Sequence, residues 1–223
     1  MTKKNYKFLT LITVFFVTVL LISNIVSTKI TIIGPFEFDA GTLLFPLSYI
    51  FADILTEVYG YKETRKVIWM GFGSIILLSS IIILVGYLPP ASDRPFQADY
   101  QNVLGLTSRI VFASLVAYFF GEFTNSYILA KIKVKMKGKY LWVRTISSTL
   151  VGELFDTMIF VLIAFYGVFD NELLKTIIIS NYVFKVGVEV LFTPLTYLIV
   201  NKLKKAEKED YYDTKTDFNP LKI

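Results

Sequence analysis

Six apolar runs, each about as long as a membrane-spanning helix, divide this chain of 223 residues. A helix needs roughly 20 mostly apolar residues to cross the hydrocarbon core of a bilayer. The second and fourth runs contain acids, but their lengths still favour spanning helices over helices buried in a soluble protein. The pattern predicts an all-α membrane protein with a six-helix transmembrane bundle, residues 1–203, and a charged tail, residues 204–223. The predicted spans are residues 8–28, 40–58, 67–88, 108–130, 145–168 and 176–203.

The segments outside the apolar runs predict three further features. Lys3, Lys4 and Lys7 precede the first run as in a signal peptide, but no small-residue cleavage site follows, so we expect a retained first helix. The longest connection begins with two prolines and predicts a short interfacial helix around Phe96–Leu104. The tail is rich in charge, and we expect it to lack fixed structure.

Basic residues are distributed unevenly between the two sides that six spans would create. Of the 23 lysines and arginines, 18 fall in the N-terminal segment, in the connections after the second and fourth runs, and in the tail. Lysine and arginine accumulate on the cytoplasmic side of membrane proteins. The bias predicts that the N- and C-termini are both cytoplasmic, which requires an even number of spans.

The composition excludes several functional classes. The chain has no histidine and no cysteine, which removes the commonest general base, the usual zinc ligands and cysteine nucleophiles. The net charge is +5, but the basic residues lie between apolar runs and not in a patch beside aromatics, so no nucleic-acid partner is expected. The sequence predicts a protein of the lipid bilayer that is not an enzyme and that has no catalytic residues, no cofactor and no metal.

Polar and ionisable residues recur with helical spacing inside four of the predicted spans. Glu122 and Asn125 are three residues apart in the fourth span. Ionisable residues within a span cost roughly 2.5–3.5 kcal/mol each on insertion, so they face the bundle interior and mark functional sites. We expect them to meet around one water-filled cavity that binds a substrate. The candidate substrate-binding residues are Asp53, Glu122, Asn125, Glu153, Asp156, Lys185 and Glu189.

The charge balance within these spans indicates the kind of ligand. Five acids face one cation, Lys185, so several carboxylates stay unmatched even if Lys185 pairs with Glu189 or Asp156. Unmatched carboxylates favour a ligand that donates hydrogen bonds or carries positive charge, such as the flat N–H edge of guanine.

Two structural alternatives stay open at this point. Lys185 and Glu189 are four residues apart and are placed to form an intrahelical pair. Asp53 and Glu57 lie close in sequence to the basic residues at 62–66, which is compatible with a structural role at the membrane interface.

Three stretches carry a family resemblance. They are ADILTEVYGYKETRKVIWMGF at 52–72, FGEFTNSYILAKIKVKMKGKYLWVRT at 120–145 and SSTLVGELFDTMIFVLIAF at 147–165. They resemble the queuosine precursor transporter family, also described as a vitamin uptake transporter family. The resemblance implies a bacterial inner-membrane importer of a 7-deazaguanine, such as 7-cyano-7-deazaguanine or 7-aminomethyl-7-deazaguanine, salvaged for tRNA modification. The matching motif positions are Asp53, Glu57, Tyr59, Gly60, Arg65, Glu122, Asn125, Glu153 and Asp156.

A substrate-binding membrane subunit of an energy-coupling, ATPase-driven vitamin importer is the alternative function. Such subunits are similar in size and typically carry an alanine-x-x-x-alanine docking pattern in the first helix. Residues 8–28 contain no alanine, and the chain has no G-x-x-x-x-G-K-[ST] motif, so an energy-coupling module is not expected as a partner. The sequence leaves open whether the chain forms a homo-oligomer and whether protons, sodium or downstream trapping drive uptake.

Overall fold

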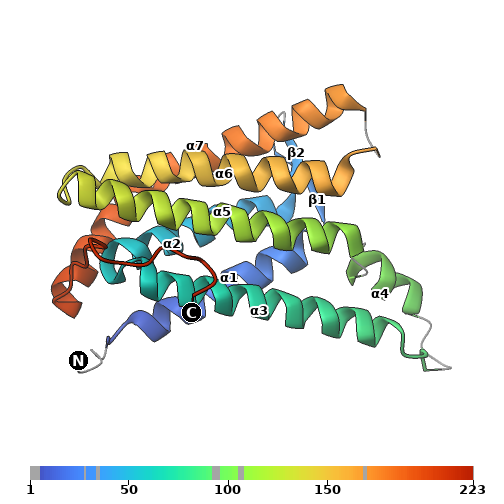
Figure 1. Ribbon diagram of the computed structural model, residues 1–223. Coiled ribbons are helices and arrows are strands. Elements are labelled where there is room, and N and C mark those ends of the chain that lie inside the picture. Colours follow the sequence, from blue (N-terminus) through green and yellow to red (C-terminus); the bar gives the residue numbers. More distant parts are fainter. Residues whose placement is uncertain are drawn as a thin grey trace.

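The described residues form seven α-helices in a computed structural model of the chain (Figure 1). The structure describes residues 6–27, 29–33, 36–91, 96–104, 108–167 and 170–222. Six of these helices are long and lie alongside one another, and the short α4 lies at one end of the bundle. The elements are α1 (Leu9–Val26), β1 (Ile30–Ile33), β2 (Phe36–Asp39), the 3-10 helix η1 (Ala40–Leu43), α2 (Phe45–Tyr59), α3 (Tyr61–Gly86), α4 (Gln97–Leu104), α5 (Ser108–Lys135), α6 (Leu141–Phe165) and α7 (Asn171–Glu207).

Five helical segments of the described residues are long and apolar enough to cross a membrane. They are α1, η1 together with α2, α3, α6 and α7. The predicted helical fold, with several helices that are candidates for crossing a membrane, is thereby confirmed. The predicted span at 108–130 corresponds to α5, which has 28 residues and is about 42 Å long at 1.5 Å per residue. It is not among the five, and the six-span count stays a prediction.

Several helices extend beyond the apolar runs that predicted them. Backbone hydrogen bonding continues where polar side chains reach the membrane surface, so a helix outlasts its apolar pattern. The helices therefore begin or end four to six residues outside the span boundaries predicted at residues 67, 130, 145, 176 and 203, and those span boundaries stay predictions. The predicted third, fourth, fifth and sixth spans correspond to the helices α3, α5, α6 and α7.

Two connections between the long helices have structure of their own. Strands β1 and β2 form an antiparallel hairpin, with Ile30 opposite Asp39, and add two short strands to an otherwise helical protein. The short helix expected around Phe96–Leu104 is confirmed as α4. Tyr100 holds it to α3 by donating a hydrogen bond over 2.9 Å to the carbonyl of Ile82.

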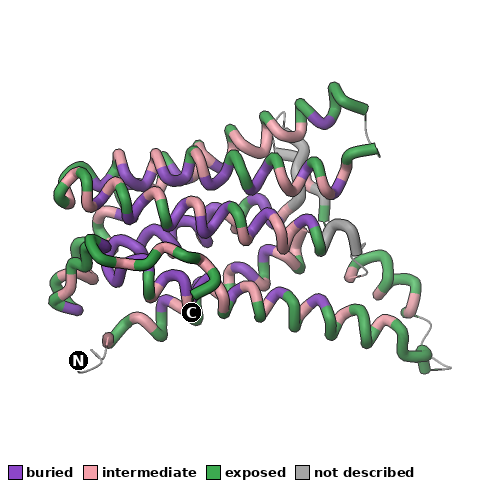
Figure 2. Tube along the Cα trace, in the orientation of Figure 1, coloured by how far each residue is buried: buried purple, intermediate pink, exposed green. Residues whose placement is uncertain are grey.

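Helix α2 lies at the centre of the bundle and packs against α1, α3, α5 and α7. Pro46 stands in its first turn, where the N–H that proline lacks has no helical partner in any case. All residues at 52–59 are buried, and Figure 2 shows buried residues gathered along α2 and the facing sides of α5 and α6. Gly60 ends the helix with φ +83°, a conformation that favours glycine. The other helices are therefore arranged around α2.

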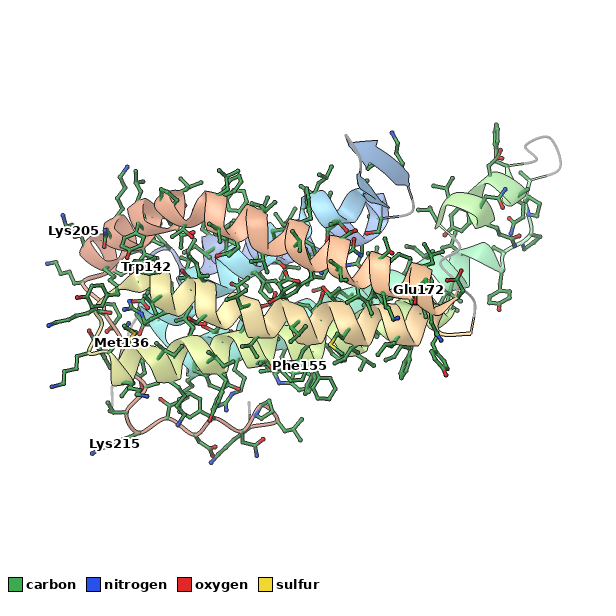
Figure 3. All side chains as sticks on the ribbon, turned by 90° about the horizontal axis from the view of Figure 1, so that it is seen from above. Met136, Trp142, Phe155, Glu172, Lys205 and Lys215 are labelled. Carbon is green, nitrogen blue, oxygen red and sulfur yellow. The ribbon has the colours of Figure 1, made fainter. Side chains whose placement is uncertain are left out.

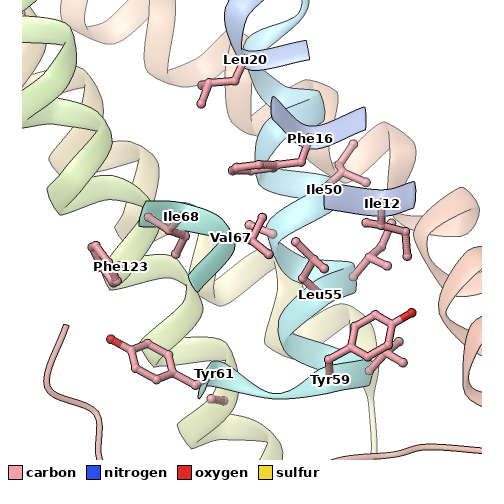
Figure 4. Packing of buried hydrophobic residues seen from close by; sticks show 14 of the residues in the cluster. Ile12, Phe16, Leu20, Ile50, Leu55, Tyr59, Tyr61, Val67, Ile68 and Phe123 are labelled. Carbon is pink, nitrogen blue, oxygen red and sulfur yellow. The ribbon is translucent and has the colours of Figure 1, made fainter. Parts of the chain in front are cut away.

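An apolar core fixes α1 and α3 against α2 (Figure 4). Phe16 and Leu20 of α1 and Ile68 of α3 are completely buried, as is Leu55 of α2. In a bilayer the helices are held by close packing of side chains more than by expulsion of water. The interdigitated core thus sets the position of α2, from which polar side chains face α5, α6 and α7.

The C-terminal tail contradicts the expectation that it lacks fixed structure. After α7 it folds back across the junction of α2 and α3. The N–H of Tyr211 donates to the carbonyl of Val58 over 3.3 Å, and the Asp213 carboxylate accepts from the N–H of Tyr61 over 3.0 Å. The tail satisfies backbone groups that would otherwise be unpaired where the helices break, and no local sequence pattern reveals such partners.

Both ends of the described chain meet at the same end of the bundle. The Glu207 carboxylate, at the end of α7, accepts hydrogen bonds from the N–H groups of Lys7 (3.0 Å) and Phe8 (2.7 Å), where α1 begins. Figure 3 shows Lys205 near this end and Glu172, at the start of α7, at the opposite end. An even number of long helices therefore lies between the two ends of the chain.

Candidate functional site

The polar residues predicted to bind substrate lie inside the bundle on four helices. All of them are buried, with exposed fractions between 0% for Asp53 and 7% for Lys185. We call these seven residues the polar cluster. They are Asp53 on α2, Glu122 and Asn125 on α5, Glu153 and Asp156 on α6, and Lys185 and Glu189 on α7.

Two glycines let α5 and α6 approach closely beside the polar cluster. A Cβ placed on Gly121 would lie 2.9 Å from the Cβ of Asp156, and a Cβ placed on Gly152 would lie 2.9 Å from the Cβ of Asn125. Small residues at such positions allow helix backbones to pack tightly in a membrane. Sequence reasoning missed both glycines, although each precedes a cluster residue by four positions and so shares its helix face.

One hydrogen bond within the polar cluster joins α2 to α5. Asn125 Nδ2 donates to Asp53 Oδ1 over 2.7 Å. The remaining oxygens, Asp53 Oδ2 and Asn125 Oδ1, are buried and have no hydrogen-bond partner in the described part of the chain. The pair therefore offers two acceptors to a ligand.

Lys185 carries the positive charge of the polar cluster. Its Nζ lies 2.6 Å from Asp156 Oδ2 and 3.1 Å from Glu153 Oε2. It also lies 4.7 Å from the centre of the Phe45 ring. Of the two pairings that the sequence left open, the interhelical one with Asp156 is confirmed. The ammonium reaches across to α6, so the intrahelical pairing with Glu189 is wrong.

Glu122 and Glu189 have no hydrogen-bond partner on either carboxylate oxygen among the described residues. The Ser48 hydroxyl lies beside Glu122 but donates over 2.7 Å to the carbonyl of Phe45. A buried carboxylate without hydrogen bonds is unfavourable when ionised, and a proton or a bound donor stabilises it. These two side chains are therefore open to a proton or a ligand.

The acids of the polar cluster interact with one another across the helices. Glu122 experiences the charges of Glu153 and Asp156 on α6. The charge of Glu189 on α7 interacts in the same way with the carboxyl groups of Glu122 and Asp53. Within the described ranges, no group of three or more acids is placed to hold a metal ion. The acids occupy one region of the bundle interior, and the prediction that water fills it stays a prediction.

A second group of charges lies at the end of the bundle where the tail docks. At its centre, the buried Glu57 accepts hydrogen bonds from Arg144 Nη2 over 2.8 Å and from Arg144 Nε over 3.1 Å. Lys204 Nζ lies 2.5 Å from Glu57 Oε1 and 2.8 Å from Asp210 Oδ1. We call this group the terminal charge cluster. It consists of Glu57, Lys133, Arg144, Lys204 and Asp210.

The partners of Asp53 and Glu57 differ from those that their sequence neighbourhood suggested. Asp53 bonds to Asn125, which is 72 positions away, and Glu57 bonds to Arg144, which is 87 positions away. These contacts support the structural role that the sequence left open for Glu57, but its charged partners are Arg144, Lys133 and Lys204 and not the basic residues at 62–66. Helical spacing reveals only neighbours on the same helix, so it cannot indicate partners at these separations.

The tail contributes Asp210 to the terminal charge cluster. Partial burial acts to raise the pKa of this carboxyl. Hydrogen bonds from Lys133 (2.6 Å) and Lys204 (2.8 Å), together with their positive charges, outweigh burial and place the pKa of Asp210 below its ordinary value. Asp210 is therefore ionised at neutral pH and attaches the tail to α5 and α7.

Sequence reasoning also missed Tyr49, which belongs to the same region as the polar cluster. It stands on α2 one helical turn before Asp53 and is completely buried. Aromatic residues in membrane helices are usually packing residues, so composition gave no reason to select it. Its spacing of four residues from Asp53 was the available signal.

Five buried acids, one lysine and one amide on four helices define a multi-pass membrane protein of the transport class, because such residues within spans mark substrate or ion pathways. The family described as "Putative vitamin uptake transporter" matches residues 39–199, which include the whole polar cluster. The chain belongs to this family.

The chain is also similar to curated bacterial proteins. The "Probable queuosine precursor transporter" of Bacillus subtilis (strain 168) is 30% identical over 169 residues, which cover 75% of this chain and 74% of the relative. The "Queuosine precursor transporter" of Escherichia coli (strain K12) is 27% identical over 214 residues, 93% of this chain and 94% of the relative. The "Probable queuosine precursor transporter" of Haemophilus influenzae is 26% identical over 188 residues, 79% and 76% of the two chains. No solved structure matches the chain.

Proposed function

We propose that this protein imports a queuosine precursor, 7-cyano-7-deazaguanine or 7-aminomethyl-7-deazaguanine, across a bacterial cytoplasmic membrane for use in tRNA modification. The names of relatives from three bacteria, matched over 74% to 94% of their lengths, support this substrate class. Membership of a transporter family supports transport over catalysis.

The observation that carries this proposal is the excess of unpartnered acceptors in the polar cluster. Both carboxylate oxygens of Glu122 and of Glu189 lack a hydrogen bond within the described residues, as does one oxygen of Asp53. A 7-deazaguanine presents a ring N–H and an amino group side by side, and one carboxylate accepts both hydrogen bonds in parallel. A planar ligand rich in donors fits this chemistry, whereas the acids would repel an anion.

The proposed topology has six spans, because α5 is added as the fourth in chain order to the five segments named above, and it puts both termini in the cytoplasm. The polar residues of α5 lie on its buried side, while Phe112 and Phe120 are 59% and 48% exposed and suit contact with lipid. The meeting of Glu207 with the start of α1 supports an even number of spans. The concentration of basic residues in the segments at this end supports a cytoplasmic location.

The alternative role, a substrate-binding subunit for a separate ATPase module, is less favoured. The first helix lacks the alanine-x-x-x-alanine pattern on which such subunits dock. The relatives carry the names of transporters and not of subunits. We therefore propose that the chain works without an energy-coupling module.

Uptake of a labelled precursor tests this proposal in bacteria that neither make the precursor nor contain an importer of their own. Expression of this chain alone should restore uptake and the queuosine content of tRNA. Uptake that appears only when an energy-coupling module is co-expressed would favour the subunit role. Absence of uptake under both conditions, with the chain present in the membrane, would contradict both functions.

A further inference from the structure

Tyr49 places a hydroxyl group beside the polar cluster without a protein partner. Its side chain is completely buried, and its oxygen has no hydrogen-bond partner within the described ranges. Buried polar groups are nearly always hydrogen-bonded in native proteins. A hydroxyl group that is kept unpaired in a binding region is therefore available to a ligand.

Two glycines fix the position of this hydroxyl group. A Cβ placed on Gly121 of α5 would lie 2.3 Å from Tyr49 Oη, and a Cβ placed on Gly152 of α6 would lie 3.1 Å from Tyr49 Cε1. Real Cβ atoms essentially never lie within 3.0 Å of a heavy atom outside their own residue and its chain neighbours. Any larger residue at position 121 would therefore displace the hydroxyl group. Gly121 and Gly152 thus permit both the close approach of α5 to α6 and the position of the Tyr49 ring.

The hydroxyl group stands among acceptors. Tyr49 interacts electrostatically with Glu122 on α5 and Asp156 on α6. Lys185 and Asn125 each donate a hydrogen bond within the protein, to Asp156 and to Asp53, whereas the Tyr49 hydroxyl group gives none to the described residues. A ligand that contains an acceptor as well as donors therefore finds in Tyr49 a donor that breaks no bond within the protein.

Other hydroxyl groups in this region that have no hydrogen-bond partner within the described residues can bond to their own helix backbone, which Tyr49 cannot do. Ser126, Thr149 and Thr157 have no partner within the described residues. On a helix, a serine or threonine side chain can rotate to the carbonyl one turn earlier, as Thr56 does over 2.8 Å. A tyrosine hydroxyl group is too far from its own helix backbone for this. The Tyr49 hydroxyl group is therefore the one best placed to form a hydrogen bond with a ligand.

We propose that Tyr49 determines substrate specificity by donating a hydrogen bond to the ring carbonyl of the substrate, while the Glu122 carboxylate accepts from the adjacent ring N–H and amino group. This inference rests on the proposed function and assigns the recognition of the lactam edge to two residues. One donor followed by two acceptors matches a carbonyl, an N–H and an amino group in a row. In an analogue with an amino group in place of the carbonyl, the adjacent ring nitrogen carries no hydrogen. The lone pair of that nitrogen would then face the Glu122 carboxylate.

Competition against uptake of the labelled precursor tests this assignment. The competitors are the unlabelled oxo compound and its 6-thio analogue, which keeps the ring N–H and the amino group but carries sulfur, a weak acceptor, at the carbonyl position. The wild-type protein should prefer the oxo compound by about ten-fold, the effect of one hydrogen bond in a buried site. The Tyr49→Phe variant removes only the donor and should bring the ratio close to one.

Two glycine variants give an independent measurement on proteins that retain the hydroxyl group. Gly121→Ala should displace Tyr49 and also lower the oxo-to-thio ratio. Gly187→Ala is the matched control on α7, because a Cβ there meets nothing within 4 Å, and it should keep the wild-type ratio.

The outcomes separate this inference from the proposed function. A wild-type ratio in both Tyr49→Phe and Gly121→Ala would overturn the role of Tyr49 and leave the transport function standing. If Tyr49→Phe does not reach the membrane, the ratio of Gly121→Ala decides. Lack of saturable precursor uptake by the wild-type protein would overturn the proposed function itself.

Discussion

Glu57 and Glu122 are both completely buried, but they differ in the hydrogen bonds that their carboxylates receive from the rest of the protein. Glu57 receives two hydrogen bonds from Arg144 and one from Lys204, and Lys133 lies 3.5 Å from it. Glu122 receives no hydrogen bond from the described residues. The first carboxylate is already occupied and holds helices together. The second is available to bind something from outside the protein.

The charge totals of the two groups show the same contrast. The terminal charge cluster sets two acids against three basic residues, with the ring of Tyr212 4.7 Å from Lys133. The polar cluster sets five acids against Lys185 alone. Buried opposite charges that satisfy one another serve structure. An excess of one sign in the interior of a membrane bundle indicates a binding site.

The largest loss of stability should follow from Glu57→Gln. This isosteric change removes the negative charge that Arg144 and Lys133 share, and leaves both cations buried. We expect the free energy of unfolding to fall by about 3–5 kcal/mol, as when one partner of a buried ion pair is removed. Thermal unfolding of the purified protein in detergent measures the difference.

The double variant Glu57→Gln with Arg144→Met is the control for this prediction. Removing one of the stranded cations should restore part of the lost stability. If the double variant is no more stable than Glu57→Gln alone, the ion pair is not the source of the loss.

A smaller loss is expected from Gly60→Ala at the junction where the tail docks. The backbone of Gly60 has φ +83°, and a Cβ would lie 2.2 Å from Cδ1 of Tyr211. Forcing such a conformation on a residue other than glycine costs about 1–3 kcal/mol, and the tail would also be displaced. The measurement is thermal unfolding together with protease sensitivity of the tail. Gly73→Ala, where a Cβ meets nothing within 4 Å, should show neither effect.

Asp210→Asn should cause a loss of at most about 1 kcal/mol, because this carboxylate is partly exposed to solvent. The pKa of Asp210 in the folded protein lies below its unfolded value of about 3.9. Its stabilising effect is therefore complete above that value and is lost as the pH falls through the folded pKa. The difference between variant and wild type should be constant from about pH 7 to pH 5 and should shrink below about pH 4. A difference that grows on acidification would contradict this assignment.

The smallest effect on stability, and the largest on transport, should come from Glu122→Gln. It is the same substitution as Glu57→Gln, but no described cation is paired with Glu122, so none is left without its counter-charge. We expect stability within about 0.5 kcal/mol of wild type and loss of precursor uptake, because one acceptor becomes a donor. Lys135→Ala, on the same helix at the basic end, should leave both unchanged. Normal uptake by Glu122→Gln would remove Glu122 from the site.

Helical spacing predicted the polar cluster but not its pairing. Glu122 with Asn125, and Glu153 with Asp156, lie three residues apart on one helix, and the structure finds all four side chains buried. The neighbours of Glu57 could not be predicted, because they come from three other helices and the tail. Tyr49 was missed because its role depends on glycines of two helices that follow much later in the chain.

The sequence by itself determined the lengths of the apolar runs, the helix faces that carry polar residues, and the excess of acids over bases within the spans. These properties depend only on the order and spacing of residues along one helix. The tertiary structure alone decided which acid meets a counter-charge, since hydrogen bonds and Coulomb attraction depend on distance in space. Arg144 reaches Glu57 from 87 positions away, and none of the described residues donates a hydrogen bond to Glu122.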